Sequence, residues 1–493
     1  MARHQINCKI YPLPELFADV KNSNIFASDI HTMQSAVKYT YKPYKPNKKQ
    51  GGNTRDIYIK HLAQQRLVSL SQNTKCLSTS AKELVANAKT RIEAYNLYWD
   101  RVKLLTNPFE RIYMTSRKFI SIPPHSQQMN ISDIEPLSRS FFKMIEMATQ
   151  YLQPLTTARR PVNSLHLAEG PGGFIEAWLS LRNRQTHMQA NHGSCQTINL
   201  LYQQDNVYAI TLIDPAFEVP SWKRSIEFLR ENPNVHIMSG ADGTGNLYSI
   251  DNLRYLAERL RFQKIELVTA DGGFDFSVGY NTQEYLACKL IFAEIIGALA
   301  VLAVGGCFLC KFFDLNNKLT ADMLYLLQCH FRLIDIIKPC TSRPANSEKY
   351  IICYGFRGIS DEVFERLLGV LNQWNQIDAG NETTVTELIS LISADTKPGP
   401  INMQFTAING LFKETAGPPA SFYAYVTQVN DKLIQTQVQN IDNTIEVIER
   451  KRFEDPDWLS TTLEHQAEMA LKWCTRFGIP AHPTPGATTK TIY

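Results

Sequence analysis

The chain carries little excess charge. Its 493 residues include 51 Lys and Arg against 47 Asp and Glu, a formal net charge of +4. So small a surplus neither demands nor excludes a nucleic-acid partner, and a charged substrate would have to meet local basic patches. The first 20 residues lack the apolar core of a signal peptide, and the ten cysteines lack the spacing of a disulfide framework. We therefore expect a protein of a reducing compartment, the cytoplasm or the nucleus.

Membrane and metal signals are also missing. Residues 290–310 imitate a membrane span, but Glu294 lies inside the run, and Gly305 and Gly306 interrupt it. We predict a buried helix, a glycine turn and a buried strand there, and no contact with a membrane. Cys307 and Cys310 lie in the predicted strand without further ligands nearby, so we expect no metal site.

Hydrophobic patterning predicts an α/β fold with flanking helical segments. Short apolar runs alternate with helical patterns from residue 164 onward, and seven candidate strands begin at Ser164, Val207, Val235, Ile265, Gly305, Phe331 and Lys349. We divide the chain into an N-terminal extension, irregular and then helical (residues 1–130), a catalytic domain (131–358) and a C-terminal helical extension (359–493). The Pro/Thr-rich end of the last segment is expected to be disordered.

Helices are predicted on both sides of these strands. Ser80 and Glu83 have the spacing of a capping box and predict one helix that extends to about Val102. Apolar residues recur along one face of that helix: Leu84, Ala88, Ile92, Tyr95 and Trp99. A second helix is expected over residues 137–152, with four residues facing a core: Phe141, Met144, Ile145 and Ala148. The polar stretch 182–206 predicts a loop, and residues 361–374 predict a further helix.

An aromatic and basic run lies near the N-terminus. Residues 39–49 interleave Tyr39, Tyr41 and Tyr44 with lysines at 42, 45, 48 and 49. Such a run could stack bases and contact phosphates. A solvated linker interrupted by proline and glycine is the alternative.

The strongest local motif is a glycine loop in LHLAEGPGGFIEAWL, residues 165–179. An apolar strand ends at Glu169, four loop residues follow, and a helix opens at Phe174: the loop is Gly170, Pro171, Gly172 and Gly173. Glycines let the backbone approach a ligand, and the helix N-terminus presents free N–H groups. A dinucleotide fingerprint is excluded because GxGxxG is absent, and a phosphate loop because the Lys-Ser/Thr ending is missing.

Two aspartates follow the next strands. Asp214 comes after the second strand, where a carboxylate suits ribose hydroxyls, and Asp242 after the third, where one could accept a hydrogen bond from an adenine amine. Each could equally be a helix cap or a turn residue.

Two lysines and two acids form a candidate catalytic set. Asp271 ends the strand of LVTADGG, Lys311 closes CFLCKFF, Glu348 precedes KYIIC, and Lys143 lies in SRSFFKMIEM. Parallel sheets place ligand sites at the carboxyl ends of their strands. A solvent-facing strand end is the usual role of a single lysine, but four such residues in step with a glycine loop indicate chemistry.

These motifs resemble those of the FtsJ-like ribose 2′-O-methyltransferases, most closely the cap-specific mRNA branch, including enzymes of large DNA viruses. The resemblance covers about residues 135–358 and rests on SLHLAEGPGGF, LVTADGGFDF, MLYLLQC and KPCTSRPANSEKYIIC. It implies a Rossmann-like S-adenosylmethionine-dependent methyltransferase sheet of about seven strands, in which the final two form a hairpin and one strand is antiparallel. The family's Lys-Asp-Lys-Glu tetrad falls on Lys143, Asp271, Lys311 and Glu348.

The resemblance also implies a cofactor and a substrate. The cofactor is S-adenosyl-L-methionine, with contacts from Glu169, Gly170, Pro171, Gly172, Gly173, Phe174, Asp214, Asp242 and Asp271. The partner is the capped 5′ end of mRNA as single-stranded RNA, together with capping or transcription machinery, or a virion or viral factory if the source is viral. Candidate RNA contacts are Arg139, Arg343 and the run from Lys42 to Lys49.

Lys311 would deprotonate or steer the 2′-hydroxyl. As a base it needs a lowered pKa, through burial or through Lys143, while Asp271 and Glu348 hold the lysines. Three alternatives stay open: an rRNA or tRNA 2′-O-methyltransferase, a catalytically silent methyltransferase-like RNA-binding subunit of a capping complex, and a small-molecule methyltransferase.

Overall fold

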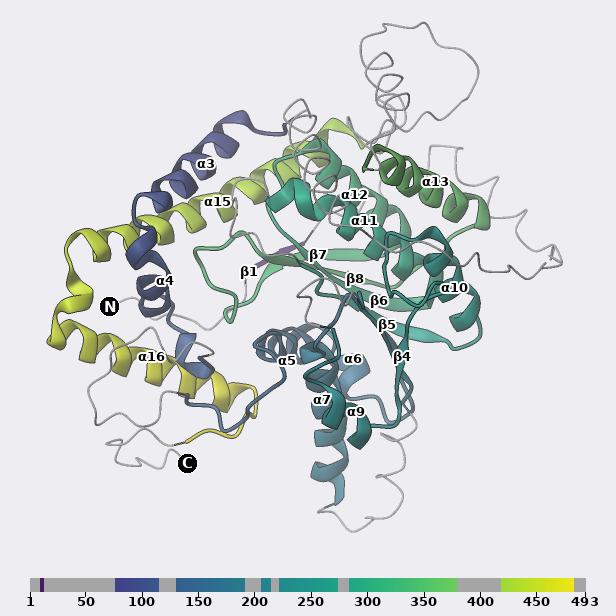
Figure 1. The fold of residues 1–493 in the computed structure, drawn as a ribbon, viewed down its shortest axis with the longest axis horizontal. Coiled ribbons are helices and arrows are strands. Elements are labelled where there is room, and N and C mark those ends of the chain that lie inside the picture. Colours follow the sequence, from purple (N-terminus) through teal and green to yellow (C-terminus); the bar gives the residue numbers. More distant parts are fainter. Residues whose placement is uncertain are drawn as a thin grey trace, which may run out of the picture.

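The computed structural model describes residues 9–12, 76–114, 130–190, 205–213, 221–273, 283–378 and 418–482, and Figure 1 shows its fold. In these ranges eight strands form one sheet, in the order β1-β7-β8-β6-β5-β2-β3-β4. The strands are β1 (Lys9–Pro12), β2 (Asn163–Leu167), β3 (Val207–Ile210), β4 (Val235–Met238), β5 (Ile265–Ala270), β6 (Leu302–Phe312), β7 (Leu333–Lys338) and β8 (Lys349–Tyr354).

The seven predicted strands are confirmed. Numbered among themselves, strands β2 to β8 lie in the order 3-2-1-4-5-7-6. Strands β2 to β6 are parallel to one another, whereas β8 is antiparallel to both β6 and β7, so the predicted terminal hairpin is present. An eighth strand was not predicted: β1, from the extension expected to be irregular, pairs antiparallel with β7.

Helices cover both faces of the sheet (Figure 1). Strand β8 illustrates why, because Tyr350 and Ile352 lie in one hydrophobic cluster while Ile351 and Cys353 lie in the other. One face packs against α10 (Ile250–Leu260), α11 (Gln283–Val301), α12 (Lys318–His330) and α13 (Asp361–Asp378). The opposite face packs against α5 (Ser140–Tyr151), α7 (Gly173–Ala190), α9 (Ile226–Glu231) and α16 (Pro456–Arg476), with α6 (Gln153–Thr156) beside α5.

Segments from the two ends of the chain pack together beside the sheet. Helices α3 (Thr79–Glu93) and α4 (Asn96–Leu105) lie along α15 (Ala420–Glu449) and share a hydrophobic cluster with it, as Figure 1 shows. The short 3-10 helix η3 (Glu110–Ile112) follows α4 and contacts α16, while η6 (Arg452–Glu454) connects α15 to α16.

The predicted helix from Ser80 to Val102 is wrong in two respects. It is two helices, and its N-cap is Ser78, whose Oγ accepts a hydrogen bond from Ala81 N at 3.3 Å. Of the predicted apolar face, Ala88, Ile92 and Trp99 are buried, whereas Leu84 is 45% exposed and Val85 is buried instead. The helices predicted over 137–152 and 361–374 are confirmed as α5 and α13, and the four core residues named for α5 are buried.

Two further predictions are corrected in part. The stretch 182–206 begins as helix, because α7 continues to Ala190, and residues 191–204 lie outside the described residues. In 290–310 the predicted helix and strand are present, but no glycine turn separates them, because β6 follows α11 directly. The two glycines lie inside β6, at a bulge where the register of β6 against β5 shifts. None of the helices in the described ranges has the length and apolarity needed to cross a membrane. The Pro/Thr-rich terminus lies outside the described residues.

Candidate functional site

The four candidate catalytic residues come together as two ion pairs. Lys143 Nζ donates to Glu348 Oε2 at 2.7 Å. Lys311 Nζ donates to the carbonyl oxygen of Asp271 at 2.7 Å and lies 3.2 Å from Asp271 Oδ1. Tyr350 joins the pairs, since its hydroxyl donates to Asp271 Oδ1 at 2.8 Å and lies 3.4 Å from Lys143 Nζ.

The sheet explains this convergence. Asp271 directly follows the parallel strand β5, and Lys311 lies near the carboxyl end of β6. Strand β8 runs the other way, so Glu348 immediately precedes it, and Tyr350 is the register partner of Lys311. Helix α5 packs on the face of the sheet to which Tyr350 belongs, and it brings Lys143 to the same sheet edge.

The neighbouring charges keep Glu348 and Lys311 ionised. Burial raises the pKa of Glu348, but Lys143, Lys311 and Lys338 outweigh it and lower the pKa to about 2. Burial lowers the pKa of Lys311, yet Asp271 and Glu348 raise it above its usual value. The expectation that burial or Lys143 lowers the pKa of Lys311 is therefore wrong in this structure. Lys143 is engaged with Glu348, and the carboxylates around Lys311 keep it an ammonium.

The glycine loop presents a free acceptor beside these pairs. Glu169 is buried, and its Oε1 accepts a hydrogen bond from Phe174 N at 2.7 Å. The other oxygen, Oε2, is buried and has no hydrogen-bond partner among the described residues. Burial and the nearby Asp271 raise the pKa of Glu169 well above its usual value. A buried acceptor without a partner calls for an explanation, and a donor or cation on a bound ligand supplies one.

Glycine is required in the loop for two different reasons, a backbone conformation at one position and close packing at two others. Gly172 has a φ of +106°, a conformation that side chains rarely adopt. At Gly173 an added Cβ would lie 2.1 Å from Ser138 Oγ, and at Gly170 one would lie 2.8 Å from the carbonyl oxygen of Ser221. Gly170 and Gly173 are thus required by packing of the loop against its own chain. Pro171, between them, accepts a hydrogen bond from Ser225 Oγ through its carbonyl.

The two later aspartates differ in what can be said of them. Asp242 Oδ1 accepts hydrogen bonds from Thr244 N (2.9 Å), Thr244 Oγ1 (2.7 Å) and Asn252 Nδ2 (2.9 Å), so it stabilises its own turn. In these contacts Asp242 acts as a turn residue, the alternative to an adenine contact that the sequence left open. Asp214 lies outside the described residues.

Of the residues expected to contact RNA, two arginines lie in the described part of the chain and both bind Glu110. Arg139 Nη1 donates to Glu110 Oε1 at 2.9 Å and to the carbonyl oxygen of Tyr113 at 2.6 Å, so its guanidinium group is engaged within the protein, and its contact with RNA stays a prediction. Arg343 also pairs with Glu110, and its side chain remains 32% exposed. The run from Lys42 to Lys49 lies outside the described residues.

Two residues of the site were not singled out from the sequence. Tyr350 lies two residues after Glu348 on a strand, and that period-2 spacing could have indicated it. Glu294, noted only as a flaw in a membrane span, is fully buried beneath the site and accepts from Gly272 N at 3.1 Å. Burial raises its pKa to about 8. Within the described ranges, no three or more His, Cys, Asp or Glu residues are grouped to hold a metal.

Comparisons with known proteins point to one family. Residues 136–356 match the model of the FtsJ-like methyltransferases. The chain is 33% identical over 237 residues to the cap-specific mRNA (nucleoside-2′-O-)-methyltransferase 2 of Drosophila melanogaster, covering 46% of this chain and 31% of that protein. It is 35% identical over 274 residues to the cap-specific mRNA (nucleoside-2′-O-)-methyltransferase 1 of Mus musculus, covering 52% of this chain and 30% of that protein. The matched region thus spans about a third of each relative.

Among solved structures, the phosphoethanolamine N-methyltransferase 1 of Haemonchus contortus is similar at 10% identity and a TM-score of 0.30, over 72% of each chain.

Proposed function

Residues 136–356 form a domain of the FtsJ-like methyltransferase family, and from that premise we propose that the chain methylates the ribose 2′-hydroxyl of a cap-proximal nucleotide of mRNA. The methyl donor is S-adenosyl-L-methionine. The observation that carries the proposal is the buried array of Lys143–Glu348 and Lys311–Asp271 at the carboxyl edge of the sheet, beside the glycine loop. Each pair places a cation next to a fixed carboxylate.

The cofactor residues fit a positively charged ligand. S-adenosyl-L-methionine supplies an electrophilic methyl group on a cationic sulfur. Glu169, the loop through Phe174, and Asp271 would hold it, with Asp214 and Asp242 as further proposed contacts. The unpartnered Oε2 of Glu169 supports this assignment. So does the mutual repulsion of the carboxyls of Glu169, Asp271 and Glu294, which a bound cation would relieve.

Lys311 acts on the acceptor as a cation. A ribose hydroxyl is a very weak acid, so its attack needs stabilisation of the developing oxyanion or removal of its proton. The raised pKa of Lys311 favours stabilisation and steering of the oxygen. Asp271 fixes Lys311 Nζ through both its carbonyl and its carboxylate. Lys143 and Glu348 hold a second fixed charge pair beside it, so positioning dominates the rate.

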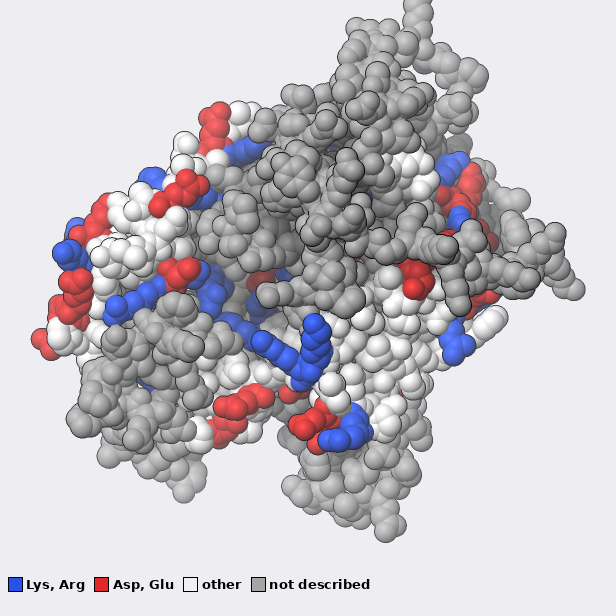
Figure 2. All heavy atoms as spheres, viewed as in Figure 1, with Lys and Arg blue, Asp and Glu red and all other residues white. Residues whose placement is uncertain are grey.

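The substrate would be single-stranded RNA at a capped 5′ end, delivered by capping or transcription machinery. Figure 2 shows Lys and Arg side chains gathered across the middle of the visible face, in the region between α4 and α5. Such a patch suits phosphates. The eight described cysteines are free thiols, which supports a reducing compartment such as the nucleus or cytoplasm. We retain the division into a catalytic domain (131–358) and two extensions as part of the proposal.

A panel of RNAs tests the function. The protein is incubated with methyl-labelled S-adenosylmethionine and with short capped RNA, the same RNA uncapped, and rRNA and tRNA transcripts. Lys311→Ala is the active-site variant. The matched control is Lys432→Ala, which removes an exposed lysine of α15.

The proposal predicts label in capped RNA, lost in Lys311→Ala and kept in Lys432→Ala. Label in uncapped, ribosomal or transfer RNA would replace the cap assignment by the rRNA or tRNA alternative. A folded protein that binds S-adenosylhomocysteine but labels no RNA would overturn the proposal in favour of a silent subunit or a small-molecule enzyme.

A further inference from the structure

One buried carboxylate outside the family domain connects two segments of the candidate site. Glu110, in η3, is 1% exposed. Its Oε1 accepts from Arg139 Nη1 at 2.9 Å and from Arg343 Nη2 at 2.8 Å, and its Oε2 accepts from Arg343 Nε at 3.0 Å and from Asn107 Nδ2 at 2.7 Å. Burial raises the pKa of Glu110, but Arg139 and Arg343 outweigh it and lower the pKa, so the group is ionised.

The two arginines belong to the segments that carry Lys143 and Glu348. Arg139 lies one helical turn before Lys143, at the start of α5. Arg343 lies in the segment between β7 and β8, next to Ser342, whose hydroxyl donates to Glu348 Oε1 at 2.7 Å. The Lys143–Glu348 ion pair and the two Glu110–Arg pairs therefore span the same gap between the same two segments.

A second buried carboxylate completes the connection from the other side. Glu146, on α5 three residues after Lys143, accepts from Cys340 N at 2.7 Å and from Thr341 N at 3.1 Å. It also accepts from Trp473 Nε1 of α16 at 3.3 Å. Residues 340–343 are thus held to α5 directly by Glu146 and indirectly through Glu110 and Arg139, while Glu348 is held by Lys143.

Helix α16 holds η3 and the residues just before it in place. Gln466 Nε2 on α16 donates to the carbonyl oxygens of Leu104 (2.8 Å), Leu105 (3.0 Å) and Asn107 (2.8 Å). Arg111 Nη1 donates to the carbonyl oxygen of Leu463 at 2.9 Å. Glu110 is therefore presented from a fixed scaffold that lies outside the region matching the family model.

From these contacts we infer that Glu110 is a positioning residue that sets the geometry of Lys143 and Glu348 through Arg139 and Arg343. The inference rests on the proposed function. Without the carboxylate charge, two guanidinium groups that repel each other face one another across a neutral side chain. Arg343, being partly exposed, then turns toward solvent, and the segment bearing Ser342 and Glu348 shifts with it. The hydrogen bonds of the cofactor loop, from Phe174 N to Glu169 and from Ser225 to Pro171, involve neither Glu110 nor the two arginines, so we expect the loop to stay in place.

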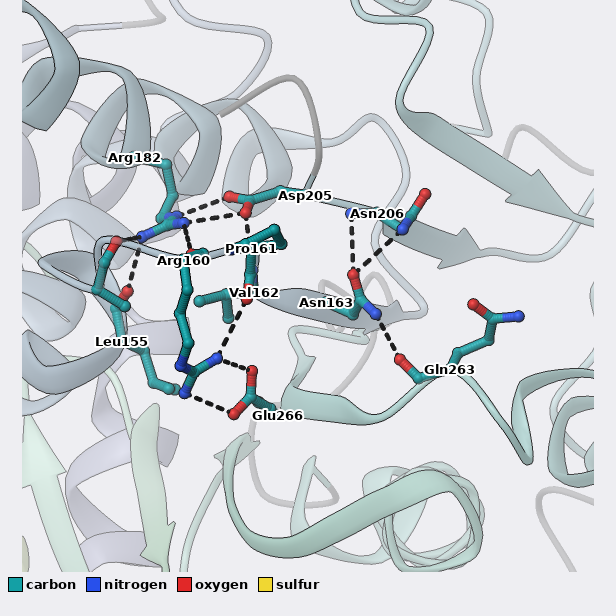
Figure 3. Close-up of polar contacts among 11 residues, drawn as sticks. Leu155, Arg160, Pro161, Val162, Asn163, Arg182, Asp205, Asn206, Gln263 and Glu266 are labelled. Atoms are coloured by element: carbon teal, nitrogen blue, oxygen red, sulfur yellow. Dashed lines mark hydrogen bonds and ion pairs between the residues drawn. The ribbon is translucent and has the colours of Figure 1, made fainter. Parts of the chain in front are cut away.

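Glu110→Gln tests the inference, with Asp205→Asn as the matched control. Asp205 is also fully buried, and it accepts from Arg182 Nε at 2.6 Å and Nη2 at 2.9 Å (Figure 3). It lies at the amino ends of β2 and β3, the opposite edge of the sheet from the tetrad. Both substitutions thus remove one buried charge from a carboxylate paired with arginine, and only Glu110 is connected to the site.

Three readouts are measured: kcat for methyl transfer, affinity for S-adenosylhomocysteine, and amide hydrogen exchange of residues 340–348. We expect Glu110→Gln to lower kcat by about 10²-fold, because a displacement of about 1 Å at a reacting group typically costs that much in rate. Cofactor affinity stays unchanged, and exchange in 340–348 accelerates. Glu110→Asp, which keeps the charge, recovers much of kcat, and Arg343→Gln reproduces the exchange change. Asp205→Asn leaves kcat and exchange in 340–348 at wild-type values.

Equal losses in Glu110→Gln and Asp205→Asn would overturn the inference, as would unchanged exchange in 340–348. If Glu110→Gln does not fold, Arg343→Gln with no effect on exchange would likewise overturn it. If amide exchange in 340–348 responds as expected but the wild-type protein transfers no methyl group, the proposed function is overturned and the positioning role of Glu110 is not.

Discussion

Replacing Glu348 by Gln tests the electrostatics of the site without changing its shape. The amide can still accept the hydrogen bond from Ser342, but it no longer balances Lys143, Lys311 and Lys338. The pKa of Glu348 falls from 4.5 to about 2, and each unit corresponds to about 1.36 kcal/mol, so we expect a loss on the order of 3 kcal/mol in unfolding free energy at pH 7. That loss agrees with the cost of removing one partner of a buried ion pair.

The pH dependence has a defined sign. A carboxyl whose pKa is lowered by folding stabilises the protein above its unfolded pKa, near 4.5 here, and that contribution disappears as pH falls toward about 2. Wild type and Glu348→Gln therefore differ fully at pH 7 and much less at pH 3.

Denaturant unfolding at both pH values measures this difference. Glu362→Gln is the control, because it breaks an exposed pair with Arg366 and should change stability by about 0.5 kcal/mol or less. A loss at pH 7 below about 1 kcal/mol, or the same loss at both pH values, would refute the electrostatic account of the site.

Three further outcomes follow from single contacts. Tyr350→Phe removes the hydrogen bond to Asp271 but keeps the ring, so unfolding free energy should fall by about 1 kcal/mol and methyl transfer should slow; unchanged transfer would remove Tyr350 from the site. Gly173→Ala should destabilise by about 1–3 kcal/mol through overpacking, whereas Gly369→Ala in α13, with open space around it, should be neutral or stabilising in the same denaturation assay. Glu294 has a pKa raised to about 8, so wild-type stability should fall between about pH 4.5 and 8, and Glu294→Gln should flatten that slope in urea midpoints; an unchanged slope would contradict the burial of its proton.

Much of the sheet and the grouping of the tetrad could be predicted from the sequence. Apolar runs such as those ending at Asp271 and Lys311 fix both the strand and the edge at which its last polar residue lies. Parallel strands bring those ends together whatever the loops do. The terminal hairpin followed from the family resemblance, because antiparallel order leaves no local pattern of its own.

What could not be predicted depends on contacts between distant segments. Arg139 and Arg343 look like any basic residues in the sequence, and only the fold places Glu110 between them. The direction of the pKa shift of Lys311 likewise depends on how many carboxylates surround it, which spacing alone cannot count. The helix from Ser80 failed locally, since two serines compete as N-cap and Ser78 has the contact.

Nucleoside mapping of the product tests the central claim most directly. Capped RNA is incubated with the protein and S-adenosylmethionine, digested to nucleosides and cap dinucleotides, and analysed by mass spectrometry. The account predicts a methyl group on the ribose 2′-oxygen of the first or second transcribed nucleotide, absent with Lys311→Ala. A methyl group on a base, on an internal ribose, or one that persists in Lys311→Ala would contradict it.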